Sequence, residues 1–115
     1  MSQSKEFMLI FRFDATQTYQ PTEAEMAEQH QHWGSFIGNI AIQEKLISTH
    51  QLGFEGKQVS ADKSVTDGIY VAQNETLGGN MVIRAASIDE ATEISKGCPI
   101  LAMGGRVEIR EILPM

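Results

Sequence analysis

The sequence predicts an α+β fold with the ferredoxin-like order β-α-β-β-α-β and an inserted excursion between the second and third core strands. Two observations predict it. Two capping boxes, Thr22–Glu25 and Ser87–Glu90, each open an apolar helical stripe. Runs with strand-like alternation lie before, between and after these helices. In this arrangement one antiparallel sheet carries both helices on the same face.

The first strand is expected over residues 7–13, FMLIFRF. Apolar side chains occupy both faces of most of this run, so we expect both faces to be covered. A polar loop over residues 14–19 follows. The first helix then begins at Thr22, and its apolar stripe has helical spacing and consists of Met26, His30, Trp33, Ile37 and Ile40.

The middle of the chain predicts the second strand, the excursion and the third core strand. The second strand covers residues 46–54, with Leu46, Ser48, His50 and Leu52 on one face. A small ribbon of residues 57–60 and 64–66 surrounds a turn at residues 61–63. Asp67-Gly68 marks a sharp turn and Gly78-Gly79 a flexible joint, after which the third core strand covers Asn80–Ala86.

The last third of the chain predicts a short helix and the final strand. The helix has Ile88, Ala91 and Ile94 on its inner face and stops at Gly97, because Cys98-Pro99 forbids its continuation. Residues 106–113 alternate, with Val107 and Ile109 on one side.

Composition and charge limit the classes of function. The chain has 115 residues, of which 42% are hydrophobic and 21% charged, as is typical of one globular domain over residues 1–115. The net charge of −6 argues against nucleic acid as a partner. The single Cys98 excludes an internal disulfide and a cysteine metal cluster. No apolar run approaches the roughly 20 residues that span a bilayer, and the polar start is no secretory signal, so we expect a cytoplasmic protein without a membrane partner.

The sheet face turned away from the helices is also apolar. Its apolar side chains are Met8, Ile10 and Ile112, together with either Met81 and Ile83 or Val82. A monomer rarely leaves such a face exposed to water. We therefore expect a second copy of the same sheet to cover it in a two-fold homodimer.

Seven short motifs together resemble the YCII-related family, and within it the DGPF-type branch. In chain order they are FMLIFR, HWGSFI, TDGIYV, LGG, SIDEATE, KGCP and RVEIREI, which extend from Phe7 to Ile112. The resemblance implies a dimeric α+β barrel built from two ferredoxin-like subunits, with a His and an Asp in its cleft that suggest enzymatic activity. Some relatives of this kind are joined to sigma-factor domains.

The residues of the DGPF motif carry over only in part. Asp67 and Gly68 match, but Ile69-Tyr70 replaces the Pro-Phe of the branch. Of the charged run that follows in the branch, only Glu75 remains. The family's His has three candidates here, which are His30, His32 and His50.

Each candidate also has a purely structural interpretation. Asp67 is either a turn residue or a residue that faces a ligand, and in an enzyme either His50 on the second strand or Asp67 would be the catalytic group that moves a proton. His30 fits a core histidine, His32 a solvated one, and Cys98 a buried thiol. Trp33 is either a core anchor or a ligand contact, and Tyr70 and Glu75 are counted with the ligand-binding residues because they lie in the motif.

Three arginines interrupt apolar strands and are the strongest candidates for an anion site. Arg12, Arg84 and Arg110 either pair with Glu108, Glu111 and Asp67 or line a pocket for an acidic ligand. Two classes of function stay open. One is a cofactor-free enzyme, isomerase- or lyase-like, that uses general acid/base chemistry in the cleft. The other is a non-catalytic module that binds a small acidic metabolite or regulates a partner. Neither metal nor cofactor is predicted.

Overall fold

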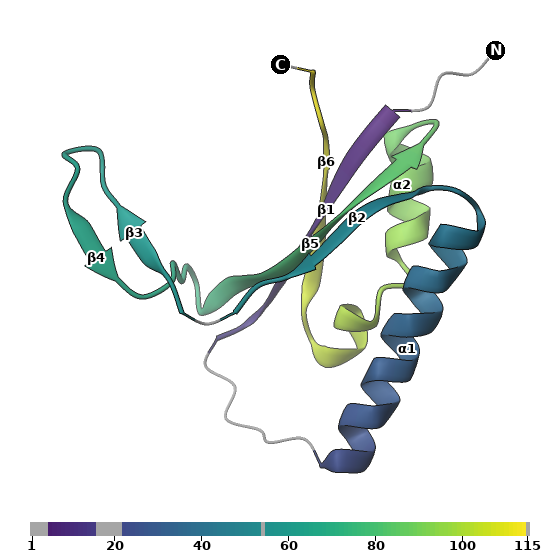
Figure 1. Ribbon diagram of the computed structural model, residues 1–115, viewed down its shortest axis with the longest axis horizontal. Coiled ribbons are helices and arrows are strands. Elements are labelled where there is room, and N and C mark those ends of the chain that lie inside the picture. Colours follow the sequence, from purple (N-terminus) through teal and green to yellow (C-terminus); the bar gives the residue numbers. More distant parts are fainter. Residues whose placement is uncertain (1–4, 16–21, 54, 115) are drawn as a thin grey trace.

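Four strands pair into one antiparallel sheet in the order β2-β5-β1-β6 (Figure 1). The structure is a computed structural model that describes residues 5–15, 22–53 and 55–114. Its elements are β1 (Lys5–Asp14), α1 (Glu23–Ile42), β2 (Leu46–Gln51), β3 (Lys57–Val59), β4 (Val65–Asp67), β5 (Glu75–Ala85), α2 (Ile88–Ser95), the short 3-10 helix η1 (Pro99–Met103) and β6 (Arg106–Glu111). Both helices lie on the same side of the sheet. The predicted ferredoxin-like α+β fold is therefore confirmed.

The core lies between this sheet and the two helices. The odd-numbered residues of β1 face the helices, and Phe7 and Leu9 are almost fully buried there. Met81 and Ile83 lie directly opposite them on β5 and are equally buried, since opposed residues share one face of a sheet. From the helices, the core receives mainly Phe36, Ile40, Ala91 and, after α2, Cys98.

Local signals explain where the helices begin. Thr22 forms a complete capping box with Glu25, as predicted, and Ser87 accepts a hydrogen bond from the backbone N–H of Glu90 at the start of α2. The expected stripe on α1 was wrong at one end: Met26 and His30 are exposed, and Phe36 takes a place in the core that the prediction omitted. The reason is that the first turns of α1 extend beyond the sheet (Figure 1).

Two shifts in strand register change which residues share a face of the sheet. Leu46 lies opposite buried Ile83, but Ser48 lies opposite Val82, so the register shifts between them. The prediction that Leu46 shares a face with Ser48 and His50 was wrong, because one extra residue in a strand turns every following side chain over. A second shift follows Phe11 and lies where Gly78 is inserted, so Gly78-Gly79 is a bulge inside β5 rather than a joint before it.

We call the sheet face opposite the helices the open face. Its central rows run across the sheet as His50, Asn80, Ile10 and Glu108, and as Ser48, Val82, Met8 and Arg110. Leu77, Arg12 and Arg106 form the row at one end, and Glu6 with Arg84 the row at the other. Met8, Ile10, Asn80 and Val82 are only half-buried. No helix among the described residues covers this face.

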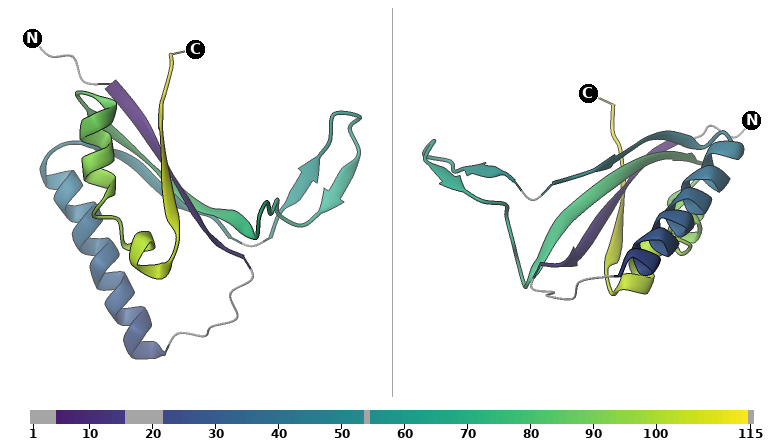
Figure 2. Two further views of the ribbon diagram at one scale, coloured as in Figure 1. Left: turned by 180° about the vertical axis from the view of Figure 1, so that it is seen from behind. Right: turned by 60° about the horizontal axis from the view of Figure 1, so that its bottom comes forward.

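The predicted ribbon is present and projects from the body as an arm, which we define as residues 57–67 (Figures 1 and 2). β3 and β4 pair only with each other. Asp62 accepts hydrogen bonds from the backbone and side chain of Ser64 and so shapes the turn at the tip.

The remaining differences from the prediction are local. Ile88 is 50% exposed and does not belong to the inner face of α2. The element η1 was not predicted, although Pro99 at its first position fits a helix start. β2 and β6 are shorter than expected, and β5 begins earlier, at Glu75. Residues 16–19 of the expected loop and Phe54 lie outside the described residues. None of the helices that the structure describes is long and apolar enough to cross a membrane.

Gly79 marks a close approach between two strands, and this gives a stability prediction. A Cβ at Gly79 would lie 2.5 Å from the backbone oxygen of His50 on β2. Because a backbone atom cannot move aside cheaply, we expect Gly79→Ala to lower the free energy of unfolding by about 1–3 kcal/mol. Gly53→Ala is the matched control, since nothing lies within 4 Å of its added Cβ. Urea denaturation measures both, and equal stability of the two variants would contradict the packing described here.

Candidate functional site

A cleft of about 870 Å³ lies at the end of the open face where the arm leaves the sheet. The sheet contributes Arg12, Leu77, Arg106 and Glu108 to its lining. Residues 55–58 at the base of the arm form a second wall, and the segment from Ile69 to Glu75 contributes a third. The cleft is therefore bounded by charged strand ends and by irregular backbone, as binding sites on rigid sheets often are.

Two ion pairs dominate the charge in this cleft. The Arg12 guanidinium binds the carboxylate of Glu108, and both side chains are partly buried. Arg106 Nε donates to Glu75 Oε2 at 2.9 Å, and the Glu75 side chain is only 22% exposed. Arg12 and Arg106 lie directly opposite each other on β1 and β6. The cleft thus contains two neighbouring guanidinium groups, each neutralised by one carboxylate.

A tight turn holds Glu75 in place. Ala72 and Glu75 exchange both backbone hydrogen bonds around Gln73 and Asn74, whose φ angles are 52° and 66°. Two successive left-handed residues define a type I′ turn, which suits the twist of a hairpin. The buried Thr76 hydroxyl donates to the Tyr70 carbonyl oxygen at 2.7 Å and ties the turn to the preceding segment. The position of Glu75 beside Arg106 is therefore built into the backbone.

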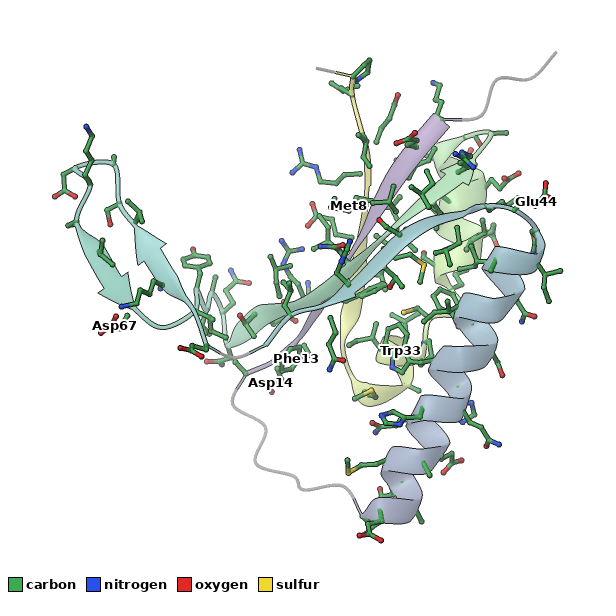
Figure 3. All side chains as sticks on the ribbon, viewed as in Figure 1. Met8, Phe13, Asp14, Trp33, Glu44 and Asp67 are labelled. Atoms are coloured by element: carbon green, nitrogen blue, oxygen red, sulfur yellow. The ribbon has the colours of Figure 1, made fainter. Side chains whose placement is uncertain are left out.

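The structure brings three of the predicted site residues together in the cleft, which are Arg12, Tyr70 and Glu75. His50 is exposed on the open face opposite Asn80 and does not line the cleft. Asp67 is on the arm, where its carboxylate accepts a hydrogen bond from Lys57 Nζ at 2.9 Å and is 87% exposed (Figure 3). His50 and Asp67 thus belong to different sheets.

The other predicted ligand contacts are separate from the cleft. Trp33 is half-buried between α1 and the sheet and packs edge-on against Phe11 and Phe36 (Figure 3). Arg84 and Arg110 are exposed on the open face, away from the cleft, and neither forms an ion pair among the residues that the structure describes. Of the predicted arginine pairs, only that of Arg12 with Glu108 is therefore present.

Arg106 is the site residue that sequence reasoning missed. Its signal is in the sequence, because strict alternation in RVEIRE places Arg106, Glu108 and Arg110 on one face. What the sequence did not indicate is that Arg106 would lie opposite Arg12, since that depends on the register between the first and last strands.

The two remaining histidines lie on α1, outside this cleft. His30 is exposed, so the prediction of a core histidine was wrong. His32 is exposed as expected, and its Nε2 atom lies 3.7 Å from Glu28 Oε1. In the part of the chain that the structure describes, no group of three or more His, Cys, Asp and Glu side chains could hold a metal ion.

Cys98 is a buried thiol, and burial raises its pKa to about 11. At pH 8 only about one molecule in a thousand would then carry the thiolate, so we expect iodoacetamide to alkylate native Cys98 far more slowly than the urea-unfolded chain.

The pH dependence of stability follows from the same raised pKa of Cys98. Between about pH 9 and about pH 11 the unfolded chain loses the thiol proton and the folded chain keeps it, so stability falls with rising pH, by up to about 2–3 kcal/mol.

Mass spectrometry of the alkylated protein and urea titrations at pH 8 and pH 10 measure the two effects. A Cys98→Ala variant, which lacks this titrating group, should lose less stability between the two pH values. Rapid alkylation of the native protein would contradict the burial described here.

Comparison with known sequences agrees with the fold and the motifs. A model of the YCII-related domain matches residues 6–115. A search of curated proteins found no match. The DGPF-type branch stays a prediction. The matched region contains both helices, the arm, the cleft and all of the sheet except Lys5, and the chain therefore belongs to the YCII-related family.

Proposed function

We propose that the protein is a homodimer that binds a small carboxylate in the cleft at the end of the open face. The observation that carries the ligand proposal is the opposed pair Arg12 and Arg106, two guanidinium groups in one cleft. A guanidinium presents parallel N–H donors that match both oxygens of a carboxylate. A ligand carboxylate can therefore compete with Glu108 for Arg12, or with Glu75 for Arg106, at the cost of freeing the carboxylate that it displaces.

The walls of the cleft suit a small ligand with an apolar part. Leu52 and Leu77 are each more than 40% exposed beside the arginines, and the Tyr70 side chain is 69% exposed. Binding a compound there removes this apolar surface from water, while the arginines fix the orientation of its carboxylate. A small acidic metabolite fits this combination better than a phosphate chain, because neither α-helix start that the structure describes lies at the cleft.

The homodimer part of the proposal rests on the open face. Val82, Met8 and Ile10 form an apolar centre that the helices of the same chain leave uncovered. A second open face would remove this centre from water, and packed sheets of this kind stack about 10 Å apart. The cleft then lies at the margin of the seam, where a ligand can enter.

A cofactor-free acid/base enzyme is the second candidate function. The observation that favours it is His50, which is exposed on the same face as Arg12, since histidine is the commonest general acid or base in enzymes. In this candidate Arg12 stabilises the negative charge that develops on the substrate. Asp67 is less suited to the role of base, because Lys57 already binds its carboxylate. The non-catalytic alternative, a regulatory module that senses the ligand, needs only the cleft.

A ligand screen tests these proposals. Small mono- and dicarboxylates are added to the wild-type protein and to His50→Ala and Asp67→Asn, and the melting temperature is recorded. We expect at least one compound to stabilise the wild type, by about 2.7 kcal/mol when its concentration is 100 times its Kd. Failure of every compound would overturn the ligand proposal. For a compound that binds, proton NMR over several hours reports turnover: product formed by the wild type and not by His50→Ala supports the enzyme, and binding without product supports the sensor.

A further inference from the structure

We propose that the arm is a clasp for the second subunit, which packs against the Val59 and Val65 side of the ribbon. This inference rests on the proposed homodimer and adds a second contact region to it. It also explains why a short ribbon projects from an otherwise two-layered protein (Figure 1).

The arm has no hydrophobic core of its own. Val59 and Val65 lie directly opposite each other and are 70% and 59% exposed. Lys57 and Asp67 lie on the same side of the ribbon, because residues two apart in a strand share a face. An isolated two-stranded hairpin is marginally stable in water unless a further surface supports it. The apolar valine pair marks the side on which that support is missing.

The direction and length of the arm point to whatever covers the open face. The arm leaves the sheet on the side away from both helices (Figures 1 and 2). From Lys57 to the tip at Asp62 it has five residue steps, or roughly 17 Å at about 3.3 Å per residue. A second sheet stacked on the open face lies only about 10 Å away. An arm of this length therefore extends alongside a subunit that is seated there.

The overall dimensions agree with a chain that is not compact by itself. The radius of gyration is 15.9 Å, whereas a compact domain of this length has about 13 Å. The Cα extents are 48 × 43 × 20 Å, so the molecule is a slab with the arm in its plane.

A second copy fits this surface better than an unrelated partner. The base of the arm and the open face are continuous through the cleft, since Lys57 and Gln58 line it together with Arg12 and Leu77. In a two-fold pair each copy supplies one arm and one open face, so both apolar surfaces are covered at once and no arm is left over. The charges do not oppose this contact, because the arm is neutral overall, with Asp62 and Asp67 against Lys57 and Lys63. The open face has the unpaired Arg84 and Arg110 among its described residues.

A matched pair of variants tests the clasp. Val65→Asp places a carboxylate on the apolar side of the arm in each copy, and Thr66→Asp places one on its other side. Sedimentation equilibrium measures the dimer dissociation constant. We expect the valine variant to weaken the dimer by at least about 30-fold and the control variant by less than about 3-fold.

A third variant separates loss of contact from unfolding of the ribbon. Val59→Thr/Val65→Thr keeps two β-branched residues and removes only apolar surface, so weaker dimerisation with a circular dichroism spectrum like that of the wild type supports the clasp. If the wild type is a dimer and the two aspartate variants dissociate equally, the clasp is overturned and the homodimer stands. If the wild type is a monomer throughout the micromolar range, both are overturned.

Discussion

The Val82→Asp variant is expected to be a monomer at concentrations where the wild type is a dimer. Val82 is half-buried on the central strand β5, and its neighbours on the open face are Met8 and Ser48. In the proposed dimer this position lies in the seam, so the substitution buries two carboxylates there, one from each copy. Because moving a charge out of water costs several kcal/mol, we expect dimerisation to weaken by more than about 100-fold. Sedimentation velocity across a dilution series measures the change.

The control for this prediction is Ile42→Asp. Ile42 is 81% exposed at the end of α1, on the helix side of the sheet. This variant has the same added charge and a comparable loss of apolar surface, but it should leave the dimer intact. Circular dichroism must show that both variants are folded. If Val82→Asp is folded and dimerises like Ile42→Asp, the open face is not part of the interface, and the reason for placing a second subunit there is lost.

Much of the fold could be predicted because its signals are local. The capping boxes at Thr22 and Ser87 each place a helix start at a definite residue, and the structure has both helices beginning immediately after them. The alternation of Val107 and Ile109 with charged residues indicated which side of β6 faces the core, and its pairing with β1 confirms it. Such patterns depend on a few neighbouring residues, so one sequence is enough to read them.

The errors have a common physical cause, which is that they depend on contacts between distant segments. The register shift between Leu46 and Ser48 depends on how β2 pairs with β5, and no residue type in β2 indicates it. The exposure of His30 follows from the length of α1 relative to the sheet, not from the periodicity of the helix. In the same way, η1 fills the space between the helices and β6 and depends on tertiary packing more than on propensity.

The site was predictable in its chemistry but not in its geometry. An arginine in an apolar strand signals a charge that needs a partner, and Arg12 has one in Glu108, as the sequence indicated. At residues 72–75 the sequence shows only that charged residues of the DGPF-type branch are missing. The backbone conformation of this turn, which the sequence did not indicate, is what positions Glu75. Asp67 and His50 were grouped through a resemblance, and the separation of the arm from the main sheet keeps them apart.

Opposite effects on ligand affinity are expected from the two members of one ion pair. Arg12→Gln removes a guanidinium that would bind the ligand and leaves Glu108 to repel it, so we expect a carboxylate found in the screen to bind at least about 30-fold more weakly. Glu108→Gln instead frees Arg12 from its internal partner. The ligand no longer has to displace a carboxylate, so its affinity should rise by about 3- to 10-fold. Isothermal titration calorimetry measures both dissociation constants.

The matched control is Glu111→Gln on the same strand, which removes one negative charge without touching the cleft. If Glu108→Gln and Glu111→Gln raise the affinity equally, the effect comes from the net charge of the protein and not from competition inside the cleft. Raising the ionic strength separates the two further, since a long-range charge effect is screened within about 10 Å at 0.1 M salt, whereas direct competition for Arg12 is largely retained. A carboxylate that binds Arg12→Gln as tightly as it binds the wild type must use another site, because a ligand held by this guanidinium cannot lose it without loss of affinity.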